Sequence, residues 1–98
     1  MPKYVIERDF SIGEERMPEV GRRSRQIIEE QFPTVTWLHS HVTVDSEGHV
    51  RSFCVYEAPD EETVREHSRL LGWHKIVGIF EVAGDVTPED FLLTPEPV

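Results

Sequence analysis

Polar and apolar side chains alternate along residues 3–10 (KYVIERDF). A period of two is typical of a strand with one buried face. After a break at residues 11–13 the pattern changes, and apolar side chains recur at helical spacing over residues 18–32 until Pro33 ends the run. The pattern therefore predicts a strand followed by a helix.

A β-hairpin is expected next in the chain. Residues 34–45 are rich in β-branched and aromatic side chains, which favour strands. The following Ser46-Glu47-Gly48 is typical of a tight turn closed by a left-handed glycine. Residues 49–58 then form the returning strand, which Pro59 ends.

A second helix is predicted between Asp60, a good N-cap residue, and Gly72, a good residue just beyond a helix C-terminus. Residues 75–83 have the composition of a final strand. One helical turn is expected at residues 87–91, and the last five residues (TPEPV) are expected to be extended or disordered.

The order strand, helix, hairpin, helix, strand predicts one α+β domain over residues 1–86, with a tail at residues 87–98. Right-handed crossovers give the ferredoxin-like β-α-β-β-α-β topology, with the antiparallel sheet order 4-1-3-2 and both helices on one face. The other face of the sheet is then left without helices.

The hairpin register decides which side chains lie on this helix-free face. A turn that closes on Asp45 and His49 places His41 opposite Phe53, His39 opposite Val55 and Trp37 opposite Glu57. The face is then expected to hold Val5, Glu7, Asp9, Trp37, His39, His41, Phe53, Val55 and Glu57.

Such a face carries both large apolar side chains and groups that bind cations. Because an apolar patch of this size is unfavourable in water, we expect the face to pack on a second copy of the chain as a homodimer. The buried imidazoles and carboxylates then need partners. Ordinary salt bridges within the dimer interface would suffice, or a divalent ion such as nickel, zinc, copper or iron could be held there.

Net charge and cysteine content narrow the classes of function. A formal net charge of −9 argues against binding to nucleic acid or to anionic membranes. The single cysteine, Cys54, excludes an internal disulfide, and no apolar run has the length of a signal peptide or a membrane helix. The protein is therefore expected in the reducing cytoplasm.

No established catalytic motif is present in the chain. A weak acid–base enzyme remains open, with His39 or His41 beside Glu57 moving protons. His67 is interpreted first as a half-buried polar residue of the second helix, and His49 and His74 as solvated.

Three segments resemble a known family: MPKYVIERDF, WLHSHVT and FCVYEAPDEETVREHSRLLGW. They are similar to small bacterial proteins filed as an uncharacterised domain, some of them described as nickel-binding, and the similarity covers roughly residues 1–83. The resemblance implies a ferredoxin-like fold related in shape to dimeric α+β barrel proteins, a dimer built on the sheet faces, and nickel as a ligand in at least one member. The family's polar positions correspond to Glu7, His39, Glu57 and His67, whereas His41 stands where an aromatic residue is more common.

Three hypotheses for function follow. The first is a nickel(II)-binding protein with Glu7, His39, His41 and Glu57 as ligands and Asp9 and His67 as additional candidates. The second is a dimeric α+β barrel enzyme, of small-molecule monooxygenase or isomerase type, that uses a histidine as general base. The third is a structural or regulatory dimer without a ligand.

Overall fold

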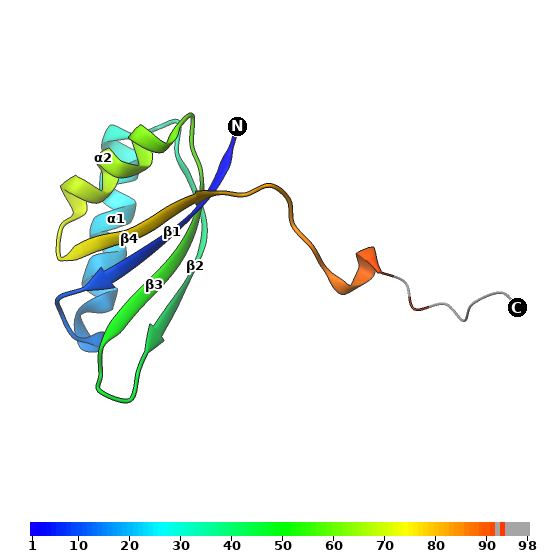
Figure 1. Ribbon diagram of the computed structural model, residues 1–98. Coiled ribbons are helices and arrows are strands. Elements are labelled where there is room, and N and C mark those ends of the chain that lie inside the picture. Colours follow the sequence, from blue (N-terminus) through cyan, green and yellow to red (C-terminus); the bar gives the residue numbers. More distant parts are fainter. Residues whose placement is uncertain (92, 94–98) are drawn as a thin grey trace, which may run out of the picture.

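The computed structural model describes residues 1–91 and 93 of the chain. Its strands and α-helices begin and end within two residues of those expected from the pattern (Figure 1), and the short 3-10 helix before the first α-helix was not expected. In chain order the elements are β1 (Lys3–Phe10), η1 (Glu14–Arg16), α1 (Met17–Gln31), β2 (Thr36–Val44), β3 (Val50–Glu57), α2 (Glu61–Leu71), β4 (His74–Glu81) and η2 (Pro88–Asp90), where η marks a 3-10 helix.

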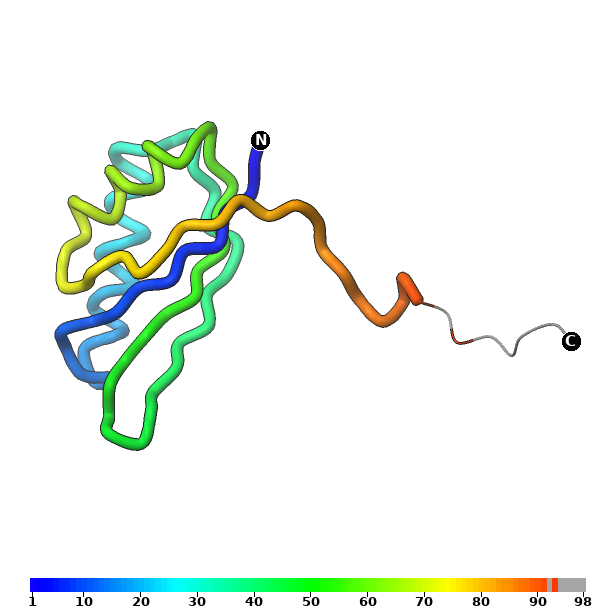
Figure 2. The backbone as a smooth tube through the Cα atoms, in the orientation of Figure 1, coloured from blue at the N-terminus to red at the C-terminus, as the bar shows by residue number. Residues whose placement is uncertain are grey.

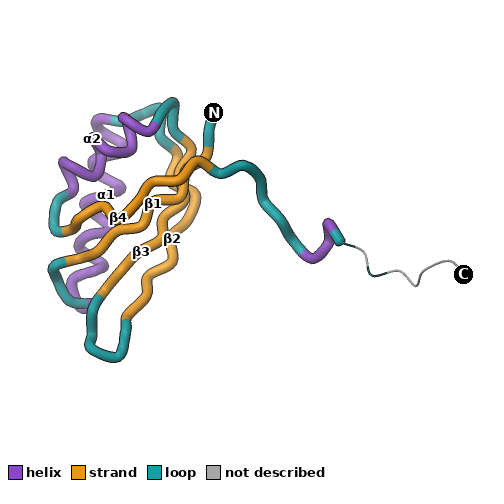
Figure 3. Tube along the Cα trace, in the orientation of Figure 1, coloured by secondary structure: helices purple, strands orange, loops and turns teal. Residues whose placement is uncertain are grey.

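The four strands form one antiparallel sheet in the order β2-β3-β1-β4. Read from the other end this is the predicted order 4-1-3-2, so the ferredoxin-like prediction is confirmed. Both helices lie on the same side of the sheet, as Figures 1 and 3 show, and the other face carries no helix.

Strand β1 shows why this sequence divides into two faces. Its even-numbered residues from Tyr4 to Phe10 are buried beneath the helices, and its odd-numbered residues are only partly covered. The same alternation runs along β3. Together with the inner faces of both helices, these strands form the core, whose largest apolar members are Tyr4, Ile6, Phe10, Ile27, Ile28, Tyr56 and Leu71.

The local signals at the ends of α2 act as predicted. The Asp60 carboxylate accepts a hydrogen bond from the backbone N–H of Thr63 at 2.8 Å, which satisfies one of the free donors of the first turn. At the other end Gly72 has a φ of 74°, a conformation that glycine adopts without strain. The helix therefore begins and ends where its sequence specifies.

The hairpin register was predicted correctly for two histidines and wrongly for Trp37. His39 pairs with Val55 and His41 with Phe53, but Trp37 pairs with Tyr56. The register shifts between Trp37 and His39, so this β-bulge turns the Trp37 side chain toward the helices.

Two contacts fix the indole of Trp37 on the helix side. It packs against the core, and its Nε1–H donates to Ser40 Oγ at 2.8 Å. Leu38, the extra residue of the bulge, has no partner on β3 and is 39% exposed. Trp37 is therefore removed from the set of residues on the helix-free face.

After β4 the chain leaves the sheet and extends away from it, as the tubes in Figures 2 and 3 show. Near the start of this segment Asp85 forms an ion pair with Lys3 at 2.8 Å. Farther along, Thr87 and Asp90 cap η2 reciprocally. The TPEPV segment lies outside the described residues. Within the described part, no helix is long and apolar enough to cross a membrane.

Candidate functional site

The central part of the helix-free face is built from three rows of side chains that cross the sheet from β2 to β4. The strand pairings place one apolar row next to a mixed row and a charged row. In this order the rows are His39–Val55–Val5–Phe80, His41–Phe53–Glu7–Gly78 and Thr43–Arg51–Asp9–Lys75.

Glycine at position 78 permits a close approach by Phe80. A Cβ added at Gly78 would lie 2.5 Å from the Phe80 ring, so the ring covers this position and extends the apolar surface. Phe80 itself is 58% exposed. An apolar ridge therefore crosses the centre of the face.

His39 and His41 lie side by side at the β2 edge of this ridge. Both are exposed, and their ring centroids are 5.4 Å apart. Their spacing of two residues directs both rings to the same face of the strand. They offer two accessible imidazoles, the ligand type that nickel, zinc and copper share.

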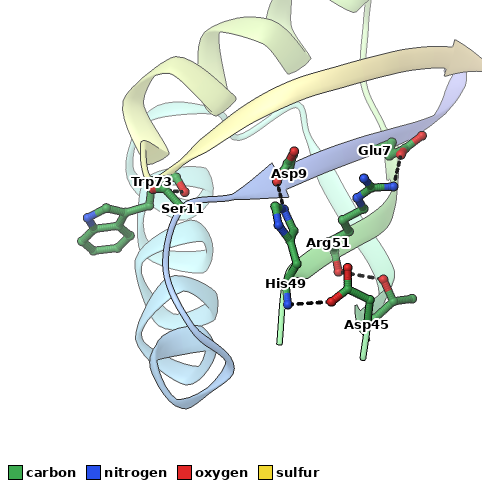
Figure 4. A network of polar contacts seen from close by, with 8 residues as sticks. Glu7, Asp9, Ser11, Asp45, His49, Arg51 and Trp73 are labelled. Carbon is green, nitrogen blue, oxygen red and sulfur yellow. Dashed lines mark hydrogen bonds and ion pairs between the residues drawn. The ribbon is translucent and has the colours of Figure 1, made fainter. Parts of the chain in front are cut away.

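Two acidic residues of the face, Asp9 and Glu7, have local partners, as Figure 4 shows. Asp9 pairs with the His49 imidazole, and this hydrogen bond is the main cause of the lowered pKa of Asp9. Glu7 Oε2 lies 4.0 Å from Arg51 Nη1. Glu57 lies at the far end of β3, opposite Lys3 and Thr36.

His67 lies on the opposite side of the sheet from the other candidate ligands. It is 1% exposed on the buried face of α2, and its Nε2 is 3.1 Å from Ser24 Oγ. Burial is the largest cause of the lowering of its pKa to about 4. This histidine is more deeply buried than its sequence position suggested.

The types of donor on the helix-free face suit nickel, but a single chain does not gather enough of them. Within residues 1–91 and 93, no three His, Cys, Asp or Glu side chains lie close enough together to hold one metal ion. The chain offers one histidine pair on this face, and the carboxylates of the face are spread along β1 and β3.

The residue that sequence reasoning missed is Arg8. It shares the alternation of Tyr4, Ile6 and Phe10, and it is 1% exposed beneath the helices. Its guanidinium donates to Tyr56 Oη at 3.1 Å, Ser68 Oγ at 2.9 Å and His74 Nε2 at 3.2 Å. The period of two in β1 was the signal that could have placed Arg8 inside.

His74 was expected in solvent and is instead part of this buried network. Its Nδ1 lies 2.7 Å from the Gly72 carbonyl oxygen, which fits a proton on Nδ1 and leaves Nε2 to accept from Arg8. Burial, with the nearby Arg8 charge as a second cause, lowers its pKa to about 4.

A cavity of about 160 Å³ lies between α1 and the sheet, on the side where Arg8 is buried. A barrel-type enzyme would need a cavity in this layer. Neither His39 nor His41 lines it, so the general bases considered for such an enzyme lie on the wrong face of the sheet.

Comparison with known proteins identifies the family of this chain. Residues 4–79 match the family model described as "Nickel responsive protein SCO4226-like". The curated proteins and the solved structures gave no significant match. Since the match covers more than half of the chain and includes both α-helices and most of each strand, the chain belongs to the SCO4226-like family of nickel responsive proteins.

Proposed function

We propose that this protein binds nickel(II) on its helix-free face, through the imidazoles of His39 and His41 and through donors from a second copy of the chain. The observation that supports this most directly is the exposed histidine pair with ring centroids 5.4 Å apart. Membership of a nickel responsive family supports the choice of metal.

The ligand set is chosen by position on the face. Glu7 lies in the same row as His41, with Phe53 between them. Glu57 lies on the same face one step beyond the row of His39. Asp9 would first have to release His49, and His67 is left out because it is buried across the sheet.

A second copy would supply the donors that one chain does not bring together. Nickel(II) takes more ligands than the two imidazoles of one protomer, and water completes whatever shell the protein leaves open. A two-fold axis on this face brings the same residues from both copies toward one another. Such packing would also cover Phe80 and its apolar neighbours.

The test is calorimetric titration of the metal-free protein with nickel, alongside zinc and cobalt. We expect His39→Ala and His41→Ala to weaken nickel binding strongly, since each removes an imidazole ligand. His49→Ala is the matched control, because it removes an exposed histidine from the same face of the hairpin.

Two results would contradict the proposal. If nickel binding is lost in His49→Ala but not in His39→Ala, the metal lies at the Asp9–His49 pair instead. If no metal binds at all, the ligand-free structural or regulatory dimer becomes the better description.

A further inference from the structure

The buried charge of Arg8 has no anionic partner among the described residues. Each ion pair found within residues 1–91 and 93 joins other residues. A buried guanidinium is costly unless it is paired or fully hydrogen-bonded. The Tyr56 ring and the negative C-terminal end of α2 give only partial compensation.

All three groups that accept hydrogen bonds from Arg8 are neutral near pH 7. Burial raises the pKa of the Tyr56 phenol to about 12 and lowers the pKa of His74 to about 4. The third acceptor is the hydroxyl of Ser68. Each of the three guanidinium nitrogens donates one of these hydrogen bonds, so two of the five N–H groups take no part in them.

The cavity beside Arg8 has the size and lining of a small-molecule site. Its volume of about 160 Å³ is close to that of an apolar cavity that accommodates one benzene ring. Val42, which is 48% exposed, forms part of its wall along β2, so this wall reaches the surface.

The lining combines one cation with apolar walls and a few hydroxyl groups. Phe10, Val20 and Leu71 contribute apolar surface, and Ser24 and Tyr56 contribute hydroxyls. Arg8 is the only charged residue of this lining. A few polar groups within an apolar wall are typical of sites that orient a small organic ligand.

We propose that this cavity binds a small organic monocarboxylate, about the size of one aromatic ring, whose carboxylate pairs with Arg8. The carboxylate receives the two remaining N–H groups, and the hydrocarbon part contacts the apolar walls. The apolar lining disfavours a strongly hydrated inorganic anion. This site lies across the sheet from the proposed nickel site and does not depend on it.

The experiment compares benzoate with benzyl alcohol, a neutral molecule with the same ring, by calorimetry on the metal-free full chain. We expect benzoate to bind and to raise the Tm of the protein. The affinity for benzyl alcohol should be lower by a factor of about ten or more, because this molecule lacks the charge that pairs with Arg8.

Two variants test the location of the site. Gly21 lines the cavity from α1, and a Cβ added there meets no other atom within 4 Å. We expect Gly21→Leu to fold, since leucine favours helix more than glycine does, and to abolish benzoate binding by filling the cavity. Arg8→Met should also abolish it, and Arg22→Met, at an exposed arginine of α1, should not.

The proposal is overturned if benzoate does not bind, if benzyl alcohol binds equally well, or if benzoate binding survives in Gly21→Leu. If Arg8→Met fails to fold, the Gly21→Leu variant and the pair of probes still decide the question.

Discussion

The same residue type has different roles on the two sides of this sheet. His39 and His41 are exposed on the helix-free face, where their ring nitrogens are accessible to a ligand. His67, on α2, bonds to Ser24, and His74, at the start of β4, accepts from Arg8 on the helix side of the sheet. Sequence alone separated the exposed pair correctly, because hairpin register fixes faces. It could not show the depth of burial of His67 or the inward turn of His74, which depend on tertiary packing.

The buried His67 predicts a pH dependence of stability. Its pKa is about 4 in the folded protein and about 6.5 when exposed, so the unfolded chain binds a proton more readily between these values. The free energy of unfolding should therefore fall as pH decreases from 6.5 toward 4, by on the order of 3 kcal/mol from this residue.

Urea denaturation of the metal-free protein at pH 7 and pH 5 measures this effect. We expect His67→Gln to reduce the loss of stability between the two pH values, while its exposed counterpart His41→Gln leaves it unchanged. An equal loss in wild type and His67→Gln would assign the dependence to other groups.

At the level of elements, the sequence predicted the fold well wherever a local signal decides the outcome. Period-two patterning fixed β1 and β3, and Asp60 and Gly72 fixed the ends of α2. The bulge before His39 was not predictable in this way. The bulge lets the Trp37 side chain pack against the core and donate a hydrogen bond to Ser40. These stabilising contacts depend on tertiary packing rather than on the local sequence pattern.

The N-cap of α2 gives a prediction at this scale. Asp60→Ala removes the acceptor for the backbone N–H of Thr63, so we expect the Tm to fall by about 5 °C. Asp85→Ala is the control, since it breaks only an exposed ion pair with Lys3 and should change the Tm little. Thermal unfolding followed by circular dichroism measures both. Equal shifts in the two variants would mean that capping does not stabilise α2.

For the whole molecule, the two faces of the sheet correspond to the two binding sites proposed above, the carboxylate site first and the nickel site second. The covered face holds Arg8 next to a cavity, and the open face holds the histidine pair next to an apolar ridge. The first is complete within one chain. The second has too few donors in one chain and an exposed Phe80, and association with a second copy would remedy both.

Phe80→Asp separates association from direct metal ligation. Phe80 lies on β4, at the opposite edge of the sheet from His39 and His41, and the substitution leaves the histidine pair of its own chain intact. If the open faces of two copies pack together, a carboxylate at this exposed apolar position should make the protein monomeric in sedimentation velocity. Nickel affinity should then fall although no ligand has been removed.

Val44→Asp provides the matched control for that variant. Val44 is 41% exposed, but it pairs with the buried Val50 and so belongs to the other face of the hairpin. If the open faces of two copies pack together, we expect this variant to be dimeric and to bind nickel like wild type. If Phe80→Asp is monomeric and still binds nickel with wild-type affinity, each protomer holds its metal alone, and the requirement for a second copy is wrong even though the histidine pair stands.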